Sequence, residues 1–379
     1  MKQCGLGTFG KVFTCIDTRT RERVAVKVIR GIRRYAKSAK IEASIIQKVN
    51  NRDKDNTSLN VRLLSIFTEK SYFESDHVCL VFEQLDISIY DFMKQNQFRG
   101  FLYESIRDIA RQMLHAVAFL HDMKLTHTDL KPENVLLVDA SYVYIPLSLS
   151  LGVGTSLSLC LTPLPHSLAH FYYITYRYDT RDDFTKPQQP YKALRSAKIK
   201  LIDFGGATFQ DQHKSSIIQT RQYRAPEVIL GYPKWNESAD VWSVACIVME
   251  TFLGDPMFAT HDSDEHLALM IRVLGPIPRK MRSRSCCSEY FRDKSHDYEL
   301  RFSSSRSKAS YSSRKYVDNA LSLKKMVSTH ANVWCEKNDK TWLDQKIQDQ
   351  FVIFLKNMLA FDPSIRFTAR ESISCEFLN

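Results

Sequence analysis

Glycine and proline are scarce in this sequence, with 12 of each among 379 residues. This scarcity excludes a collagen-like or low-complexity chain. The nine cysteines include no CxxC pair and no Cys/His spacing typical of a zinc site. We therefore expect reduced thiols in a cytosolic or nuclear protein. No apolar stretch precedes the first glycines, so we also expect no signal peptide.

Asp, Glu, Lys and Arg are all absent from residues 142–176. An apolar run of about 20 residues would be long enough for a membrane helix. However, 5 of the 17 residues from 145 to 161 are Ser or Thr, and three prolines interrupt the longer run. These residues disfavour a membrane segment. We interpret residues 142–180 as an atypical uncharged insertion at the surface.

Hydrophobic residues make up 44% of the chain and charged residues 25%, which suits a globular protein with a sizeable core. Runs of β-branched residues predict strands within residues 11–29, 61–67 and 78–82. Helical apolar spacing predicts helices at residues 37–49, 106–120, 241–253 and 351–359. We expect an α+β fold, with a small β-rich lobe at 1–84 and a larger helical lobe at 85–379. Within the second lobe, residues 282–345 are rich in Arg and Ser and predict a loop-rich insert.

A glycine-rich segment, Gly5–Val12, opens the chain and has strand patterns on both sides. Glycines let backbone N–H groups approach phosphates closely, but a lone GxGxxG is weak evidence. Lys27 ends the strand pattern VAVK, where it would lie under a glycine hairpin. Glu42 on the following helix could pair with it and fix the ammonium against phosphates. An isolated VAVK would more simply be a surface lysine.

The most informative segment is His127–Leu137, which reads HTDLKPENVLL. Within it, Asp129 can accept a hydroxyl proton, Lys131 can reach a transferring phosphate, and Asn134 can bind a metal. Downstream, Asp203 follows an apolar strand and begins Asp-Phe-Gly, which suits Mg²⁺ held between phosphates. The triplet Ala-Pro-Glu ends at residue 227. Each triplet alone could be an ordinary loop, but their order is highly specific.

This ordered set resembles the eukaryotic protein kinase domain, with its bilobal fold. The segment Glu265–Pro278, EHLALMIRVLGPIP, resembles the signature of the LAMMER (Cdc-like) kinases of the CMGC group. Residues 125–129 (LTHTD), 90–92 (YDF) and 220–227 (TRQYRAPE) also resemble that family. The resemblance covers nearly the whole chain apart from about residues 142–180.

The resemblance implies a role for each matching residue. The implied catalytic residues are Asp129 as base, Lys131 beside it, and the pair Lys27 and Glu42. The implied ATP-contacting positions are Gly5, Gly7, Gly10, Val12, Ala25, Lys27, Phe82, Glu83 and Leu85. The implied Mg²⁺ ligands are Asn134 and Asp203. The implied structural residues are Glu227, which would pair with Arg366, and Asp240, which would anchor the catalytic loop.

The same resemblance implies an ATP- and Mg²⁺-dependent kinase that phosphorylates Ser and Thr in Arg/Ser-rich splicing factors. Such kinases also autophosphorylate on Tyr and are chiefly nuclear, with a cytoplasmic fraction as the alternative. We expect a monomer that acts on protein substrates, with no membrane partner and no direct nucleic-acid partner.

Several positions depart from the family pattern. Thr128 stands where many kinases have Arg, a trait that LAMMER kinases share, so we expect activity that does not require activation-loop phosphorylation. Leu269 and Ile271 replace the Met and Glu of the signature. The chain begins four residues before Gly5, so we expect a truncated first strand. The spacing of 68 residues between Asn134 and Asp203 is longer than in the family, as a retained intron would make it.

Three alternatives remain open. The truncated strand and the insertion would suit a catalytically inactive kinase-fold scaffold or the product of an incomplete gene model. The net charge of +11 could instead indicate RNA binding, although no aromatic RNA-binding motif accompanies it. The tract at 302–314 is either a solvated loop or an internal substrate mimic open to autophosphorylation.

A basic substrate also requires an acidic groove, for which the candidates are Glu83, Asp86 and Asp91.

Overall fold

The computed structural model describes residues 2–7, 9–70, 76–145, 191–212, 215–303, 309–335 and 344–379. Its N-terminal part is a five-stranded antiparallel sheet with the order β1-β2-β3-β5-β4. The strands are β1 (Lys2–Leu6), β2 (Gly10–Ile16), β3 (Arg23–Ile29), β4 (Leu63–Glu69) and β5 (His77–Glu83). Every strand predicted from the sequence before residue 84 is therefore present.

The first strand, expected to be truncated, forms a five-residue edge strand that pairs with β2 from Lys2↔Thr14 to Leu6↔Lys11. The glycine segment thus connects two paired strands. Gly10 is required at its position, because an added Cβ would lie 2.2 Å from the carbonyl oxygen of Val28 on β3. No side chain fits in that space.

Helix α1 (Arg33–Arg52) packs against the sheet with one face buried. Ala39, Ala43, Ile46 and Val49 recur at intervals of three and four residues and are all buried. Glu42 lies on the same face and is also buried. A carboxylate is therefore carried into the apolar side of α1, where it requires a cation.

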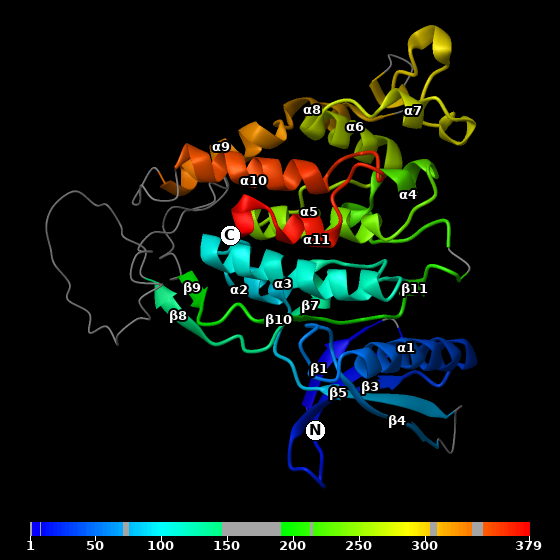
Figure 1. The fold of residues 1–379 in the computed structure, drawn as a ribbon, viewed down its shortest axis with the longest axis vertical. Helices are drawn as coiled ribbons and strands as arrows, with labels where there is room; N and C mark the ends of the chain where they lie inside the picture. The colour runs from blue at the N-terminus through cyan, green and yellow to red at the C-terminus, as the bar shows by residue number, and fades with distance from the viewer. Residues whose placement is uncertain are drawn as a thin grey trace, which may run out of the picture.

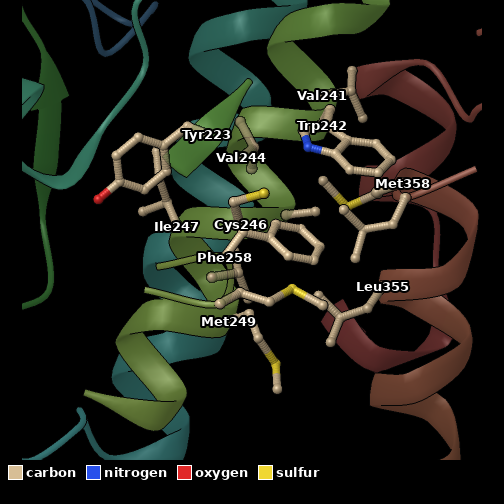
Figure 2. Close-up of a cluster of buried hydrophobic side chains, with 14 of the residues drawn as sticks. Tyr223, Val241, Trp242, Val244, Cys246, Ile247, Met249, Phe258, Leu355 and Met358 are labelled. Atoms are coloured by element: carbon tan, nitrogen blue, oxygen red, sulfur yellow. The ribbon is translucent and has the colours of Figure 1, made fainter. Parts of the chain in front are cut away.

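The remainder of the described chain is mainly helical, as predicted (Figure 1). Its helices are α2 (Ile89–Gln95), α3 (Tyr103–Asp122), α4 (Pro226–Leu230), α5 (Ser238–Leu253), α6 (Ser263–Leu274), α7 (Arg279–Arg282), α8 (Tyr311–Asn319), α9 (Leu323–Cys335), α10 (Gln345–Met358) and α11 (Ala369–Ile373). Helix α5 is buried over nearly its whole length. Figure 2 shows the side chains of Trp242 and Met249 from α5 packed toward Leu355 and Met358 of α10.

Two short strand pairs lie between the sheet and the helices (Figure 1). Strand β7 (Val135–Leu137) pairs with β10 (Ile199–Leu201), and β6 (Leu125–Thr126) pairs with β11 (Thr208–Phe209). Consequently, the segment that follows β6 and the segment that follows β10 are held side by side. These are the segments in which the sequence predicts the catalytic and metal-binding residues.

The two predicted inserts differ in outcome. Of the 142–180 insertion, only residues 142–145 are described; they form β8 (Tyr142–Ile145), which pairs with β9 (Tyr191–Leu194). The segment 282–345 is not loop-rich throughout, because its described residues form α8 and α9. Val317 and Leu323 are buried there. Because serines and lysines surround these few apolar residues, the sequence shows no clear helical spacing. None of the helices in the described ranges is long and apolar enough to cross a membrane.

Candidate active site

Lys27, Glu42 and Asp203 meet at the junction of the sheet, α1 and the segment after β10. Lys27 Nζ donates hydrogen bonds of 2.8 and 3.0 Å to the two carboxylate oxygens of Glu42. The same ammonium lies 3.6 Å from Oδ1 of Asp203. The sheet, the helix and the downstream loop thus each contribute one charged group to a single cluster.

Burial and charge oppose each other within this cluster. Burial favours the neutral form of Lys27, but the nearby carboxylates of Glu42 and Asp203 outweigh it and raise the pKa of the ammonium above its usual value. Burial raises the pKa of the Glu42 carboxyl, while the Lys27 charge works against that shift. Lys27 therefore remains a cation at neutral pH, available for an anionic ligand.

The Asp-Phe-Gly segment is fixed by its phenylalanine. Phe204 is fully buried, and its ring centroid lies 5.2 Å from that of His127. The His127 side chain lies 3.0 Å, Nε2 to oxygen, from the carbonyl of Ile202. Asp203 adopts a left-handed backbone with φ of 66°, which turns its carboxylate toward Lys27. Packing of Phe204 inward thus goes with orientation of Asp203 outward.

Asp129 lies in a second polar cluster, on the loop between β6 and β7. Lys131 Nζ donates a 2.7 Å bond to Oδ2 of Asp129, and the Thr220 backbone N–H and hydroxyl donate bonds of 3.0 and 2.7 Å to Oδ1. Asn134 donates a 2.8 Å bond from Nδ2 to the carbonyl oxygen of Asp129. Asp129, Lys131 and Asn134, which the sequence grouped, are therefore adjacent in space.

These contacts determine the charge of Asp129. Burial works to raise the pKa of its carboxyl, but the hydrogen bonds from Lys131 and Thr220 and the Lys131 charge together lower it. Asp129 is consequently an anion at neutral pH. A hydroxyl proton has an acceptor here, and Lys131 supplies a cation next to it.

Asp240 of α5 anchors this loop from below. Its carboxylate accepts bonds of 2.8 Å from the backbone N–H of His127 and 2.9 Å from that of Thr128. Its Oδ2 also lies 3.0 Å from Nε2 of His121. Because Asp240 is completely buried, the loop is fixed to the core helix through its main chain. The sequence-based anchoring role matches this placement.

Glu227 and Arg366 form a bidentate pair, with both N···O distances at 2.7 Å. Neither side chain is exposed to solvent. Arg366 also donates to the carbonyls of Ser238 and Ala360, so most of its N–H groups are satisfied. The pair joins the end of the 203–227 segment to the C-terminal part of the chain.

The predicted ATP-contacting residues occupy adjacent strands. Val12 is paired with Lys27, and Ala25 with Phe82, across neighbouring strands of the sheet. Gly5, Gly7 and Gly10 precede this region along β1 and β2, and Leu85 follows β5 as a buried residue. The predicted positions therefore extend along β3, from Gly10 opposite Ile29 to Phe82 opposite Ala25, with Lys27 between them.

Glu83 has a different environment from the one we expected for an acidic groove. Its Oε1 accepts a 2.8 Å bond from the Arg62 backbone N–H and a 2.5 Å bond from Lys200 Nζ. The hypothesis that Glu83 faces a basic substrate is wrong, because buried Lys200 already neutralises it. Asp86 is exposed and accepts hydrogen bonds from the N–H groups of Ile87 and Ala140. Asp91, on α2, is also exposed and accepts one from the Ser88 hydroxyl.

Sequence reasoning missed three contributors to the site. Thr220 was quoted only as part of a motif, yet it contacts Asp129 directly. Tyr223 donates a 2.7 Å bond to the buried carboxylate of Glu250. Lys200 pairs with Glu83, although the two are 117 residues apart. The apolar surroundings of Lys200 and Glu250 in the sequence were the available signal.

The geometry agrees with comparisons to known proteins. A family model described as the protein kinase domain matches residues 1–148 and 191–378. The chain belongs to the protein kinase family. It is 36% identical over 381 residues to the serine/threonine-protein kinase AFC1 of Arabidopsis thaliana, covering 100% of this chain and 70% of that protein. It is 34% identical to the human dual specificity protein kinase CLK1, covering 99% of this chain and 64% of CLK1.

A solved structure supports the same conclusion. The crystal structure of the PF14_0431 kinase domain superposes with a TM-score of 0.77 at 33% identity, covering 100% of this kinase and 94% of that chain. The predicted kinase fold is thus confirmed, and so is the resemblance to the Cdc-like, or LAMMER, group. The kinase spans about two thirds of the length of CLK1 and AFC1, so their full-length properties are not transferred with the family.

Proposed function

We propose that this kinase transfers the γ-phosphoryl group of ATP, with Mg²⁺, to Ser and Thr hydroxyls of Arg/Ser-rich proteins. One observation carries the proposal: Lys27 is paired with Glu42 and faces Asp203, while Asp129 lies ionised beside Lys131. Protein kinases need both arrangements together. The inactive-scaffold alternative would require one of them to be broken.

The nucleotide fits the residues of the sheet. Gly5, Gly7 and Gly10 carry no Cβ, so N–H groups of the glycine segment can approach phosphates. Lys27 supplies a cation for the α- and β-phosphates, held in place by Glu42. Val12, Ala25, Phe82 and Leu85 offer apolar surface for an adenine ring.

Mg²⁺ fits Asp203 and Asn134, because carboxylate and amide oxygens are its preferred protein ligands. Asn134 uses its Nδ2 for the Asp129 carbonyl, which leaves Oδ1 as a ligand atom. The carboxylate of Asp203 is 43% exposed, so it is accessible to a hydrated cation. The metal would neutralise charge on the transferred phosphoryl group.

Asp129 positions the acceptor hydroxyl and takes its proton as the transfer proceeds. Lys131 stabilises charge that develops on the transferring phosphoryl group. Thr220 begins residues 220–224, which we propose as the substrate-binding segment, and it holds Asp129 through its N–H and hydroxyl. Binding of a substrate to that segment is therefore coupled directly to the orientation of the base.

Two carboxylates favour arginine in the substrate. Glu133, four residues after Asp129, is exposed. Glu250 is buried under Tyr223; burial raises its pKa to about 7, the Tyr223 hydrogen bond lowers it, and the charge of Glu133 raises it further. A guanidinium next to both groups would ionise Glu250 and relieve the repulsion. This replaces the acidic groove at Glu83 as the support for a basic substrate.

The remaining properties rest on the relatives. CLK1 is named as a dual specificity kinase, and we propose that this kinase likewise autophosphorylates on Tyr. The LAMMER resemblance supports Arg/Ser-rich splicing factors as substrates and the nucleus as the place of action. We propose a monomer as the active species.

The test is phosphoryl transfer to an Arg–Ser repeat peptide and to a matched Lys–Ser peptide. We expect the wild-type kinase to prefer the Arg–Ser peptide, and Glu133→Gln to raise its KM roughly ten- to a hundredfold without changing the KM for ATP. Glu22→Gln, which changes an exposed glutamate in the β2–β3 turn, is the control. Equal use of both peptides, or no response to Glu133→Gln, would contradict the Arg-directed site.

A further inference from the structure

Helix α8, whose first four residues end the Arg/Ser tract at 302–314, is attached to α6 at both of its ends. At the first end, the Ser313 hydroxyl donates a 2.8 Å hydrogen bond to Oε1 of Glu265. At the second end, Arg272 donates bonds of 3.0 Å to the carbonyls of Asp318 and Ala320. Figure 1 shows α8 alongside α6. Ser313 therefore makes a polar contact that fixes the N-terminal end of α8.

The acceptor of that contact lies among other acids. Glu265 is only 5% exposed, and its second oxygen accepts a 3.1 Å bond from the His261 N–H. Asp262 is the N-cap of α6 and accepts a hydrogen bond from the Glu265 N–H. Asp264 lies in the first turn of the same helix. Burial and the charges of Asp262 and Glu289 raise the pKa of Asp264. Added negative charge at this end of α6 would thus meet a site that already disfavours it.

Ser313 also has the chemistry of a substrate. It precedes Arg314 and Lys315 and follows Ser312, which matches the Arg/Ser class proposed above. The hydroxyl of Ser312 is exposed and bonds with Ser310, whereas Ser313 faces Glu265. Two neighbouring serines in a similar sequence context therefore differ in their exposure and in what they contact.

We propose that Ser313 is a phosphorylation site of this kinase, and that phosphate on Ser313 releases α8 from α6. The proposal rests on the proposed function. Helices α6 and α8 lie on the side of the helical part that faces away from the sheet, whereas the active site lies next to the sheet, so the reaction takes place between two copies (Figure 1). The γ-phosphorus forms a bond to Ser313 Oγ, its bond to the oxygen of the β-phosphate breaks, ADP leaves, and Asp129 of the other copy receives the hydroxyl proton.

Release has a physical cause in the contact that is lost. A hydroxyl donates to Glu265, but a phosphate only accepts and carries about two negative charges at neutral pH. The buried carboxylate would face a dianion at hydrogen-bond distance, which a low-dielectric site makes strongly unfavourable. Local opening of α8 places that phosphate in water.

The consequence reaches the substrate-binding segment through α6. The residue after Glu265 is His266, which is fully buried; burial and the charges of Arg224 and Arg221 lower its pKa to about 3. Both arginines belong to the segment that follows Thr220. Phosphorylation of Ser313 therefore loosens the end of α6 that carries His266, whose pKa responds to the charges of Arg221 and Arg224.

The first experiment needs no catalysis. Ser313→Glu and the matched Ser312→Glu are compared by amide hydrogen exchange over residues 311–319. We expect Ser313→Glu to speed exchange there by about tenfold or more, and Ser312→Glu to leave it near wild type. Adding Glu265→Gln to Ser313→Glu should restore protection. Equal exchange in the two single variants would overturn the release of α8.

The second experiment tests the modification. Wild-type kinase is incubated with ATP–Mg²⁺ and an Asp129→Asn chain as substrate, and the phosphorylated residues are located by mass spectrometry. We expect phosphate on Ser313. Transfer to an Arg–Ser peptide without phosphate on Ser313 overturns this site and leaves the proposed function intact. If neither the peptide nor the Asp129→Asn chain is phosphorylated, both the Ser313 site and the proposed function are overturned.

Discussion

The hydroxyl of Thr128 donates a 2.8 Å hydrogen bond to the carbonyl oxygen of Gly206. The carbonyl of Thr128 in turn accepts a 2.9 Å bond from the N–H of Gln219. One neutral residue thus connects the catalytic loop to both parts of the 203–227 segment. Gln219 is buried and bonds through its side chain to Ala239, Ser243 and Ala225, so the segment is fixed without a phosphate.

From this arrangement we predict that phosphatase treatment leaves the transfer rate within about twofold of the untreated kinase. Position 128 carries no positive charge that an activation-loop phosphate would neutralise. The measurement is peptide phosphorylation before and after complete dephosphorylation, verified by mass spectrometry. Gln219→Ala should lower the rate in both samples alike. A collapse of the rate on dephosphorylation would show that the segment depends on phosphate after all.

Lys27 and Glu42 give a second prediction. Replacing Lys27 by Met removes the cation that faces Asp203 and should lower kcat/KM roughly 10²- to 10³-fold, as loss of one preorganised electrostatic group does. Glu42→Gln should act in the same direction, since Lys27 then loses its fixed partner. Lys40→Met, which changes an exposed lysine on α1, is the control. Steady-state kinetics on folded protein would refute the prediction if all three variants matched wild type.

The Glu227–Arg366 pair gives a prediction about stability. Removing Arg366 with Ala leaves a fully buried carboxylate and should cost about 3–5 kcal/mol of unfolding free energy. The double variant Glu227→Gln, Arg366→Met should cost less, because it leaves no uncompensated charge. Arg370→Met, at the exposed pair with Asp122, should change little. Chemical denaturation measures all three, and equal losses for the Arg366 and Arg370 variants would contradict the account.

Glu250 predicts a pH dependence. Its pKa in the folded chain is about 7, against an ordinary value of 4.5, so the folded state holds more protons than the unfolded state between these values. The unfolding free energy should therefore fall as pH rises from about 4.5 to about 7. Glu250→Gln removes this contribution, and the difference between wild type and variant isolates it. A pH-independent difference would mean that Glu250 ionises normally.

Much of this arrangement could be predicted from the sequence. The β-branched run of β3 and the helical spacing of α1 and α3 are local apolar patterns, which a single sequence contains. The short segments around Asp129 and Asp203 carry their chemistry in adjacent residues. Ordered motifs of this kind predict which residues are catalytic from the sequence alone.

Other features depend on distant packing, and the local sequence does not identify the partner residue. The sequence around Lys200 predicts a surface lysine in a strand, whereas the structure shows Lys200 buried and bonded to Glu83. Helix α8 hides its few apolar residues in a tract that composition assigns to loops. The burial of Glu250 follows from α5 being enclosed on all sides, which periodicity cannot reveal. Polar residues in the core are thus the part that sequence reasoning missed.

The most direct test of the central claim is transfer of labelled phosphate from ATP–Mg²⁺ to an Arg–Ser repeat peptide, comparing this kinase with Asp203→Asn. Asp203 faces Lys27 and is proposed to hold the metal, so the substitution should abolish transfer while the thermal transition of the protein persists. Transfer by the wild type that disappears in the variant is the predicted result. Absence of transfer by a folded wild-type chain, or equal transfer by Asp203→Asn, would contradict the account.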